Sequence, residues 1–100
     1  MSNTIAFNEV KEKYAATLEQ YVPVVSRVHG DTHPEFYGVH KMYDAIVAKI
    51  KEAGSTKPDL NEEFGQLREM TSDYIIPQGV CETYEAVYNM LAELDKAYHA

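Results

Sequence analysis

Apolar residues recur every three or four positions along four stretches of the sequence, which is the spacing of one face of an α-helix. The first stretch starts near Asn3 or Thr4, either of which can cap a helix, and ends at Gly30, where a left-handed cap is expected. Its apolar positions are Phe7, Val10, Tyr14, Leu18, Tyr21, Val25 and Val28. Pro23 lies inside this pattern and crowds the carbonyl of Glu19, so the sequence predicts a kinked but continuous helix.

The second stretch has a clear start and a clear stop. Thr32 and Glu35 have the spacing of a capping box, and Gly54 is the residue type that ends helices. The apolar positions between them are Phe36, Val39, Tyr43, Ile46 and Ile50. Residues 55–58 form a short linker that ends in a proline. The pattern therefore predicts a second helix that starts soon after the first one ends.

The third stretch is shorter and less regular. It starts at Asp59, with Glu62 at the capping-box position, and its apolar positions are Leu60, Phe64, Leu67, Met70 or Thr71, and Tyr74. Gly65 interrupts the pattern, either because two helices approach closely there or because the site tolerates a glycine. Residues 75–79, which include Pro77, break the helix, and we expect this turn to pack its two isoleucines onto the bundle.

The fourth stretch is the most regular and runs to the C-terminus. Its apolar positions are Val80, Tyr84, Val87, Leu91, Leu94 and Tyr98. Four amphipathic helices with short connections place sequential neighbours antiparallel, and no stretch shows the two-residue alternation of a strand. The sequence therefore predicts a single all-α domain over residues 1–100, an up-down-up-down antiparallel four-helix bundle.

Composition and charge narrow the classes of partner. Nine basic and sixteen acidic residues give a net charge of −7, which argues against nucleic acid and anionic membranes as partners. No apolar run approaches the roughly 18–20 residues of a membrane span. The single cysteine, Cys81, excludes an internal disulfide, and the N-terminal residues lack the pattern of a signal peptide. These features predict a cytoplasmic protein.

The histidines are the first candidates for metal ligands. His40 and Asp44 are four residues apart on one helical face, so they supply two ligands or form an ordinary ion pair. His29 is either a ligand or a histidine that the helix C-terminus satisfies, while His33 and His99 favour structural or solvated roles. A stable transition-metal site needs three or four ligands, and no histidine has the Glu-x-x-His spacing of ferritin-type di-iron bundles.

Nucleophilic chemistry has one candidate residue. Cys81 falls in the first turn of the fourth helix, where a helix N-terminus favours a reactive thiolate. The alternative is a small buried apolar residue. The sequence contains neither a glycine-framed serine nor a glycine-rich phosphate loop, so we expect no enzymatic activity.

Two segments carry a resemblance to a known family. The first is Arg27-Val28-His29-Gly30-Asp31 followed by His33-Pro34-Glu35-Phe36. The second is Leu67-Arg68-Glu69-Met70-Thr71-Ser72-Asp73-Tyr74, then Pro77, Cys81-Glu82-Thr83-Tyr84, Tyr88 and Leu91-Ala92-Glu93-Leu94. Together they resemble the hemerythrin-like di-iron proteins that repair iron–sulfur clusters (the RIC, or ScdA/YtfE, family). The segments match in order and cover most of the chain after residue 20.

The resemblance implies a hemerythrin-like bundle, and in that family histidines and glutamates from all four helices hold a di-iron centre. Carried across residue by residue, only His29 matches a family ligand, and the other first-helix ligand falls near Asn8. Residues 48–54 and 57–63 contain no histidine where the family has one, and the fourth-helix ligands would fall beyond Ala100. The resemblance therefore implies the fold without a complete di-iron site in one chain.

We expect a degenerate hemerythrin-like bundle that holds no cofactor and acts by binding a protein. One alternative is a metal-binding protein, with iron at a site rebuilt from His29, His40, Asp44 or neighbouring carboxylates, within one chain or across a dimer, serving iron–sulfur cluster repair or a stress response. Another is a redox-sensing bundle that uses Cys81. Long tyrosine-rich seams on a short bundle leave an apolar face uncovered, which predicts a homodimer or a heteromeric protein partner.

Overall fold

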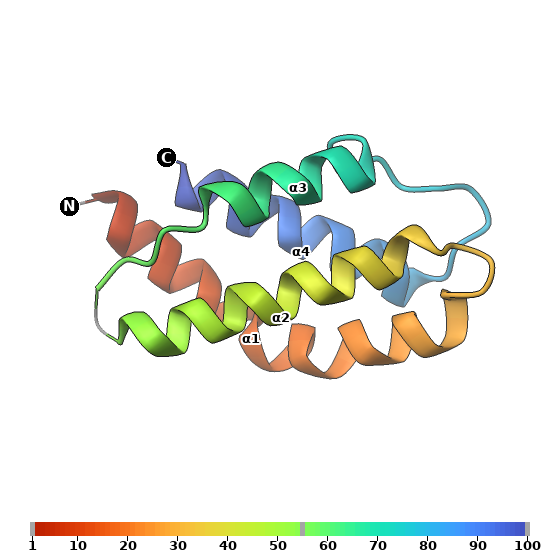
Figure 1. The fold of residues 1–100 in the computed structure, drawn as a ribbon, viewed down its shortest axis with the longest axis horizontal. Helices are drawn as coiled ribbons and strands as arrows, with labels where there is room; N and C mark the ends of the chain where they lie inside the picture. Colours follow the sequence, from red (N-terminus) through yellow and green to blue (C-terminus); the bar gives the residue numbers. More distant parts are fainter. Residues whose placement is uncertain (1, 55, 100) are drawn as a thin grey trace.

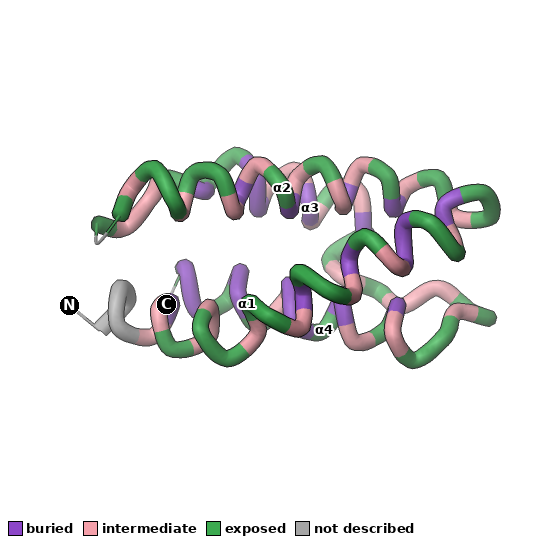
Figure 2. The backbone as a smooth tube through the Cα atoms, turned by 90° about the horizontal axis from the view of Figure 1, so that it is seen from below, coloured by how far each residue is buried: buried purple, intermediate pink, exposed green. Residues whose placement is uncertain are grey.

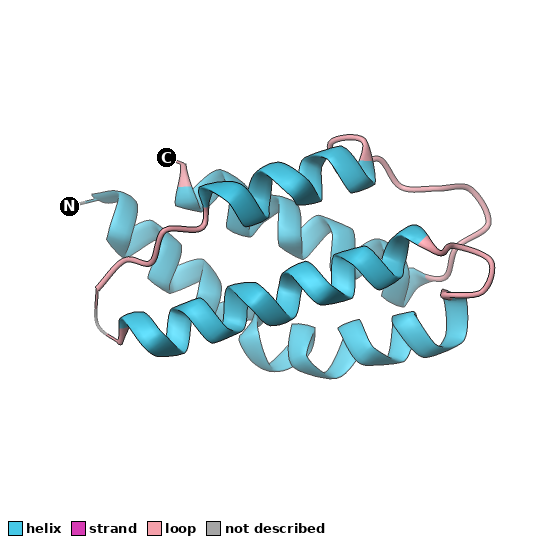
Figure 3. Cartoon of the chain, viewed as in Figure 1, coloured by secondary structure: helices cyan, strands magenta, loops and turns pink. Residues whose placement is uncertain are grey.

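The computed structural model describes residues 2–54 and 56–99, and over this part of the chain it contains four helices and no strand. The helices are α1 (Ser2–His29), α2 (Glu35–Ala53), α3 (Asn61–Thr71) and α4 (Glu82–Tyr98). They alternate in direction along the long axis of a molecule that measures 40 × 22 × 21 Å (Figure 1). Short loops join α1 to α2 and α2 to α3, and a longer one joins α3 to α4 (Figure 3). The predicted all-α antiparallel four-helix bundle is confirmed.

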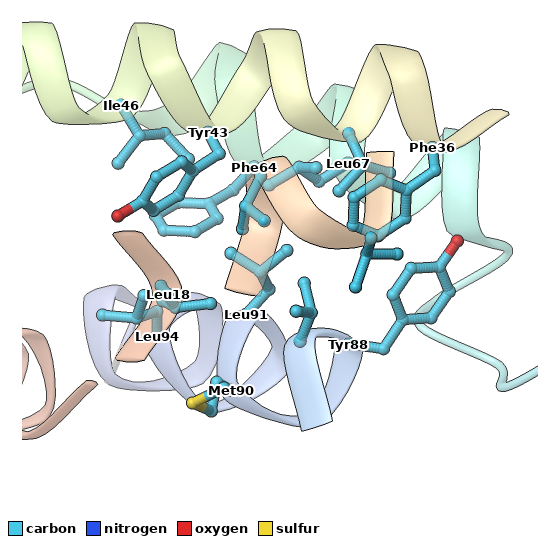
Figure 4. Packing of buried hydrophobic residues seen from close by; sticks show 14 of the residues in the cluster. Leu18, Phe36, Tyr43, Ile46, Phe64, Leu67, Tyr88, Met90, Leu91 and Leu94 are labelled. Carbon is cyan, nitrogen blue, oxygen red and sulfur yellow. The ribbon is translucent and has the colours of Figure 1, made fainter. Parts of the chain in front are cut away.

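The four helices form two layers. Figure 2 shows α1 beside α4 in one layer and α2 beside α3 in the other, with buried residues on the faces that meet. Apolar side chains from all four helices fill the space between the layers (Figure 4). The fully buried large residues are Phe7, Leu18, Val22, Val25, Phe36, Val39, Leu60, Phe64, Leu67, Tyr84, Tyr88 and Leu91. No helix in the described ranges is long and apolar enough to cross a membrane.

The buried face of α1 departs from the predicted stripe in its second half. Val22 is fully buried in place of Tyr21, and Val28 is 62% exposed while His29 turns inward. An α-helix has 3.6 residues per turn, so the predicted steps of three and four residues after Leu18 reach positions that are rotated away from the buried face. The helix is continuous through Pro23, and its axis changes direction in its middle (Figure 1), as the predicted kink requires.

Gly30 ends α1 for a reason other than the predicted one. It does not adopt a positive φ, and its N–H donates to the carbonyl of Ser26 at 3.0 Å. A Cβ atom at Gly30 would overlap both the Tyr37 ring and the Ser26 carbonyl oxygen. The left-handed cap is therefore wrong, and the glycine is needed for space. Gly54 does have a positive φ, of 63°, and confirms the predicted stop of α2.

Neither predicted capping box forms. The Thr32 hydroxyl donates back to the carbonyl of His29, and α2 begins later, at Glu35, whose side chain turns into the bundle. The third helix begins at Asn61, two residues later than predicted, and the Asp59 carboxylate accepts from the N–H of Asn61 at 3.3 Å. At the second helix the long-range contact of Glu35 with Tyr84 outweighs the local capping pattern, whereas at the third helix Asp59 caps through a different backbone N–H.

The buried carboxylate of Asp95 ties the two layers together. Asp95, on α4, is only 5% exposed. The Arg68 guanidinium of α3 contacts both carboxylate oxygens, at 2.7 and 2.9 Å, and the Tyr74 hydroxyl donates to one of them at 2.7 Å. The His99 ring lies 2.9 Å away. Burial, and then the hydrogen bond to Asp95, raise the pKa of Tyr74 above its usual range, so this hydroxyl stays a donor.

The turn after α3 is built from left-handed residues. Ser72, Asp73 and Tyr74 have φ values of 52°, 61° and 65°, a conformation that non-glycine residues rarely adopt. The N–H of Tyr74 donates to the Thr71 hydroxyl at 2.8 Å. Beyond the turn, Ile76 packs against the core, but Ile75 is 67% exposed, so the expectation that both isoleucines pack is confirmed only for one.

Gly65 provides a test of helix stability. A Cβ atom there would meet only the tip of Arg68, at 3.9 Å, so no close helix approach requires the glycine. We expect Gly65→Ala to stabilise the protein by about 0.5–1 kcal/mol, because glycine lowers helix propensity. Urea unfolding followed by far-ultraviolet circular dichroism measures the change. Gly30→Ala, which would clash, should lower the midpoint; a lower midpoint in Gly65→Ala would contradict the argument.

Candidate functional site

Polar side chains from three segments meet where α1 ends and α4 begins. We call this cluster the His29 corner; it comprises His29, His33, Glu35, Cys81 and Tyr84. The turn after α1 brings the chain back on itself, with the N–H of His33 donating to the carbonyl of His29 at 2.8 Å. Ring centroids of the two histidines are 6.5 Å apart. The corner therefore joins residues that are far apart in the sequence.

His29 and Cys81 are in direct side-chain contact at this corner. The Nε2 atom of His29 lies 3.2 Å from the Sγ atom of Cys81. Cys81 is exposed and precedes the first residue of α4, with extended backbone angles typical of a residue that caps a helix. The interpretation of Cys81 as a small buried apolar residue is therefore wrong. A thiol and an imidazole in contact are two donors of the kind that soft metal ions prefer.

Tyr84 organises the inner side of the corner. Its ring is fully buried and lies edge-on to His29 and to His33, with centroids at 5.7 and 5.4 Å. Its hydroxyl donates to a Glu35 oxygen at 3.2 Å, and that oxygen lies 3.3 Å from Nδ1 of His33. The hydroxyls of Tyr84 and Tyr88 are 3.1 Å apart. Because Tyr84 donates to Glu35, Tyr88 is the donor to Tyr84.

Burial keeps these two tyrosines protonated. It is the largest cause that raises the pKa of Tyr84 above its usual range, followed by the hydrogen bond with Tyr88. Burial also raises the pKa of Tyr88. The two phenols therefore form a fixed chain in which Tyr88 donates to Tyr84 and Tyr84 donates to the Glu35 carboxylate, which His33 contacts from a second side.

A di-iron centre does not fit the residues around His29. Within residues 2–54 and 56–99, no three His, Cys, Asp or Glu side chains are grouped so as to hold a metal ion. The interior beside His29 is occupied by the rings of Tyr84, Phe36 and Tyr88, all buried and in mutual contact. A carboxylate-bridged centre needs inward-facing glutamates and histidines from several helices, and here aromatic rings take that space.

The other predicted ligands lie apart from this corner. Nε2 of His40 and Oδ2 of Asp44 are 3.5 Å apart on α2, where the Asp44 side chain is 68% exposed, so the pair has the geometry of a surface ion pair. The structure groups neither residue with His29 in a three-ligand arrangement among the described side chains. His99, expected to be structural or solvated, contacts Asp95 and also Asn61, at 3.2 Å. The pairing of His29 with Cys81 carries no sequence signal, because 52 positions separate them.

A groove runs between α1 and α2 on the surface. Its volume is about 370 Å³, and it is lined by Lys11, Glu12, Ala15, Glu19, Pro23, Tyr43, Asp44, Val47, Ile50 and Lys51. The helices are antiparallel, so Lys11 and Lys51 lie toward one end while Glu19 and Asp44 lie toward the other. The floor is apolar, and the end with Lys11 and Lys51 has a net positive charge despite Glu12, while the other end is negative.

The chain is similar to curated proteins named iron-sulfur cluster repair protein ScdA from two strains of Staphylococcus epidermidis. It is 25% identical to each over 125 aligned residues, which cover 94% of this chain and 56% of the relative. The chain thus spans little more than half the length of these relatives, and the alignment is longer than the chain itself. No family model matches the sequence, and no solved structure matches it.

The buried phenol of Tyr84 predicts a pH dependence of stability. Because folding raises its pKa, its stabilising contribution is complete below the ordinary pKa of tyrosine, about 10, and falls as the pH rises above that value toward the raised pKa of the folded protein. Tyr84→Phe should cost about 1 kcal/mol at neutral pH by losing hydrogen bonds. We expect this deficit to shrink by about pH 11. Urea unfolding across this range measures it, and parallel curves for the two proteins would contradict it.

Proposed function

We propose that this chain is a degenerate hemerythrin-like bundle that serves iron–sulfur cluster repair by binding a protein, without a complete di-iron site of its own. The process is suggested by the name of the relatives to which 94% of the chain aligns. The observation that carries the proposal is the aromatic filling of the interior beside His29. A scaffold of this kind retains a fold and a surface, and its activity depends on what that surface binds.

The aromatic filling supports the proposal through its energetics. Tyr84 and Tyr88 are fully buried, with ring centroids 4.9 Å apart, and Phe36 lies 5.1 Å from Tyr84. Opening a metal pocket there would expose these rings and break the hydrogen bonds among their hydroxyls and Glu35. Each buried aromatic side chain contributes roughly 1.5–3 kcal/mol or more by its burial alone, so the packed state is strongly favoured.

The groove between α1 and α2 supports a protein as the partner. Val47, Ile50 and Tyr43 offer apolar contacts along one helix face, and amphipathic helices bind such grooves through a row of apolar side chains. The charges at its ends favour one direction of a bound helix, with acidic residues near Lys51 and basic residues near Asp44. We assign such a helix to another protein.

Metal binding in the same process is a second candidate function, and one observation favours it. His29 and Cys81 present two donor atoms side by side, and Cys81 is at the surface. Two donors are insufficient for a stable site, so further ligands have to come from outside the described residues. Iron at a rebuilt or intersubunit site is the version of this function that the resemblance to iron–sulfur cluster repair proteins favours.

A charge placed in the groove tests the proposed function. In cells that lack this protein, we expect the Val47→Glu variant to fail to restore iron–sulfur cluster repair. A carboxylate on the apolar floor would have to lose its hydration when an apolar partner face binds, which is unfavourable. Recovery of an iron–sulfur enzyme's activity after oxidative damage is the measurement. Ala48→Glu is the matched control, since Ala48 is the next residue on α2 and is exposed.

Two outcomes would overturn this function. One is full rescue by Val47→Glu, which would show that the groove is not used. The other is a content of about two iron atoms per chain in the purified wild-type protein, which would restore a di-iron site. Far-ultraviolet circular dichroism of both variants confirms that the charge has not unfolded the bundle.

A further inference from the structure

We propose that two copies of this chain share one zinc ion, to which each copy contributes Nε2 of His29 and Sγ of Cys81. The inference rests on the same pair as the second candidate function above, replaces iron by zinc, and does not depend on the groove between α1 and α2. It rests on the contact between these two atoms, on the exposure of Cys81 and on the absence of a third ligand among the described residues.

The two donor atoms are already spaced for one metal ion. Their separation is 3.2 Å. A zinc ion about 2.3 Å from sulfur and about 2.0–2.1 Å from nitrogen, in tetrahedral geometry, places these ligands roughly 3.5 Å apart. A small rotation of either side chain supplies the difference. Tyr84 holds the His29 ring edge-on, so the orientation of the imidazole is largely set before the metal arrives.

The ligand count requires a second molecule. A closed structural zinc site has four ligands, and the described residues of the His29 corner present two that are free to share a metal. His33 is the nearest other histidine, but its Nδ1 atom pairs with Glu35 and its ring centroid is 6.5 Å from that of His29. No group of three candidate ligands occurs in the described ranges. If a two-fold axis passes through the metal, a second copy of the chain supplies the same histidine and cysteine. The four ligands then form a Cys₂His₂ site, a tetrahedral ligand set that favours zinc.

The position of the pair allows two molecules to approach. α1 ends and α4 begins at the same end of the bundle (Figure 1), whose cross-section is only about 22 × 21 Å. Val28, 62% exposed beside His29, adds an apolar contact next to the metal. Binding Zn²⁺ releases the two thiol protons, so the site is formally neutral and needs neither oxidant nor reductant. A self-complementary contact of this kind closes at two copies.

Zinc titration of the reduced protein tests the proposal. Metal-free protein, kept in a phosphine reductant so that no disulfide forms, is titrated with zinc chloride while light scattering gives the mass. We expect saturation at half an equivalent of zinc per chain and a doubling of mass at the same point. With Co²⁺ in place of zinc, a sulfur-to-cobalt charge-transfer band should appear at the same stoichiometry.

Variants assign the ligands. Cys81→Ser and His29→Ala should each remain monomeric and lose the stoichiometric binding, and Cys81→Ser should also lose the cobalt charge-transfer band. His33→Ala and His40→Ala are the controls and should keep both zinc and the dimer. Val47→Glu should do the same, which separates a failure of this site from a failure of the groove.

The shared site would be overturned by one zinc per monomer, by no zinc binding at micromolar concentration, by a dimer that forms without metal, or by a dimer that Cys81→Ser retains. Loss of zinc in His33→Ala would likewise overturn it, because the third ligand would then come from the same chain.

Discussion

The arrangement of the bundle depends on one buried carboxylate. Apolar packing holds the two layers together but leaves their relative position loosely specified, because it is not directional. Asp95 removes this freedom, since Arg68, Tyr74 and His99 converge on it from three segments. Arg68 stays 39% exposed, so water hydrates the outer side of the pair while the carboxylate itself is satisfied inside. The α3 helix, the turn after it and the end of α4 are thereby fixed in one register.

The corner where α1 ends and α4 begins is held by a second carboxylate, that of Glu35. Glu35 accepts from Tyr84 and lies beside His33, while the rings of the same tyrosine and both histidines pack together. The thiol of Cys81 contacts this network only through Nε2 of His29, and Cys81 is exposed. The His29 corner therefore combines a rigid inner wall with an accessible outer donor pair. A site that a second molecule completes needs both properties. The packed rings fix the orientation of the His29 imidazole in advance, and the exposed thiol stays accessible to the second molecule.

The sequence predicts the helices well because their signals are local. Apolar spacing along Phe36, Val39, Tyr43 and Ile46 identifies a face that the structure buries, and the i,i+4 pair of His40 and Asp44 is found in contact. Signals that need distant partners are lost. The Thr32 capping box fails because Glu35 is drawn to Tyr84, 49 positions away. Asp95 is an acidic residue next to Leu94 on the apolar face of the fourth helix, which is a weak sequence signal of a buried carboxylate. Its partner Arg68 is 27 positions away, so the sequence does not identify the pair.

The left-handed turn at Ser72–Tyr74 sets the order in which the molecule opens. Three consecutive non-glycine residues in this conformation hold strain of about 1 kcal/mol each. Contacts of Arg68 and Tyr74 with Asp95 offset that strain only while all of them are intact. When the contacts with Asp95 break, the turn relaxes and the end of α3 detaches, while the apolar side chains of α4 stay buried. The turn is therefore a cooperative unit of low local stability, whose amides exchange with solvent well before those of the core.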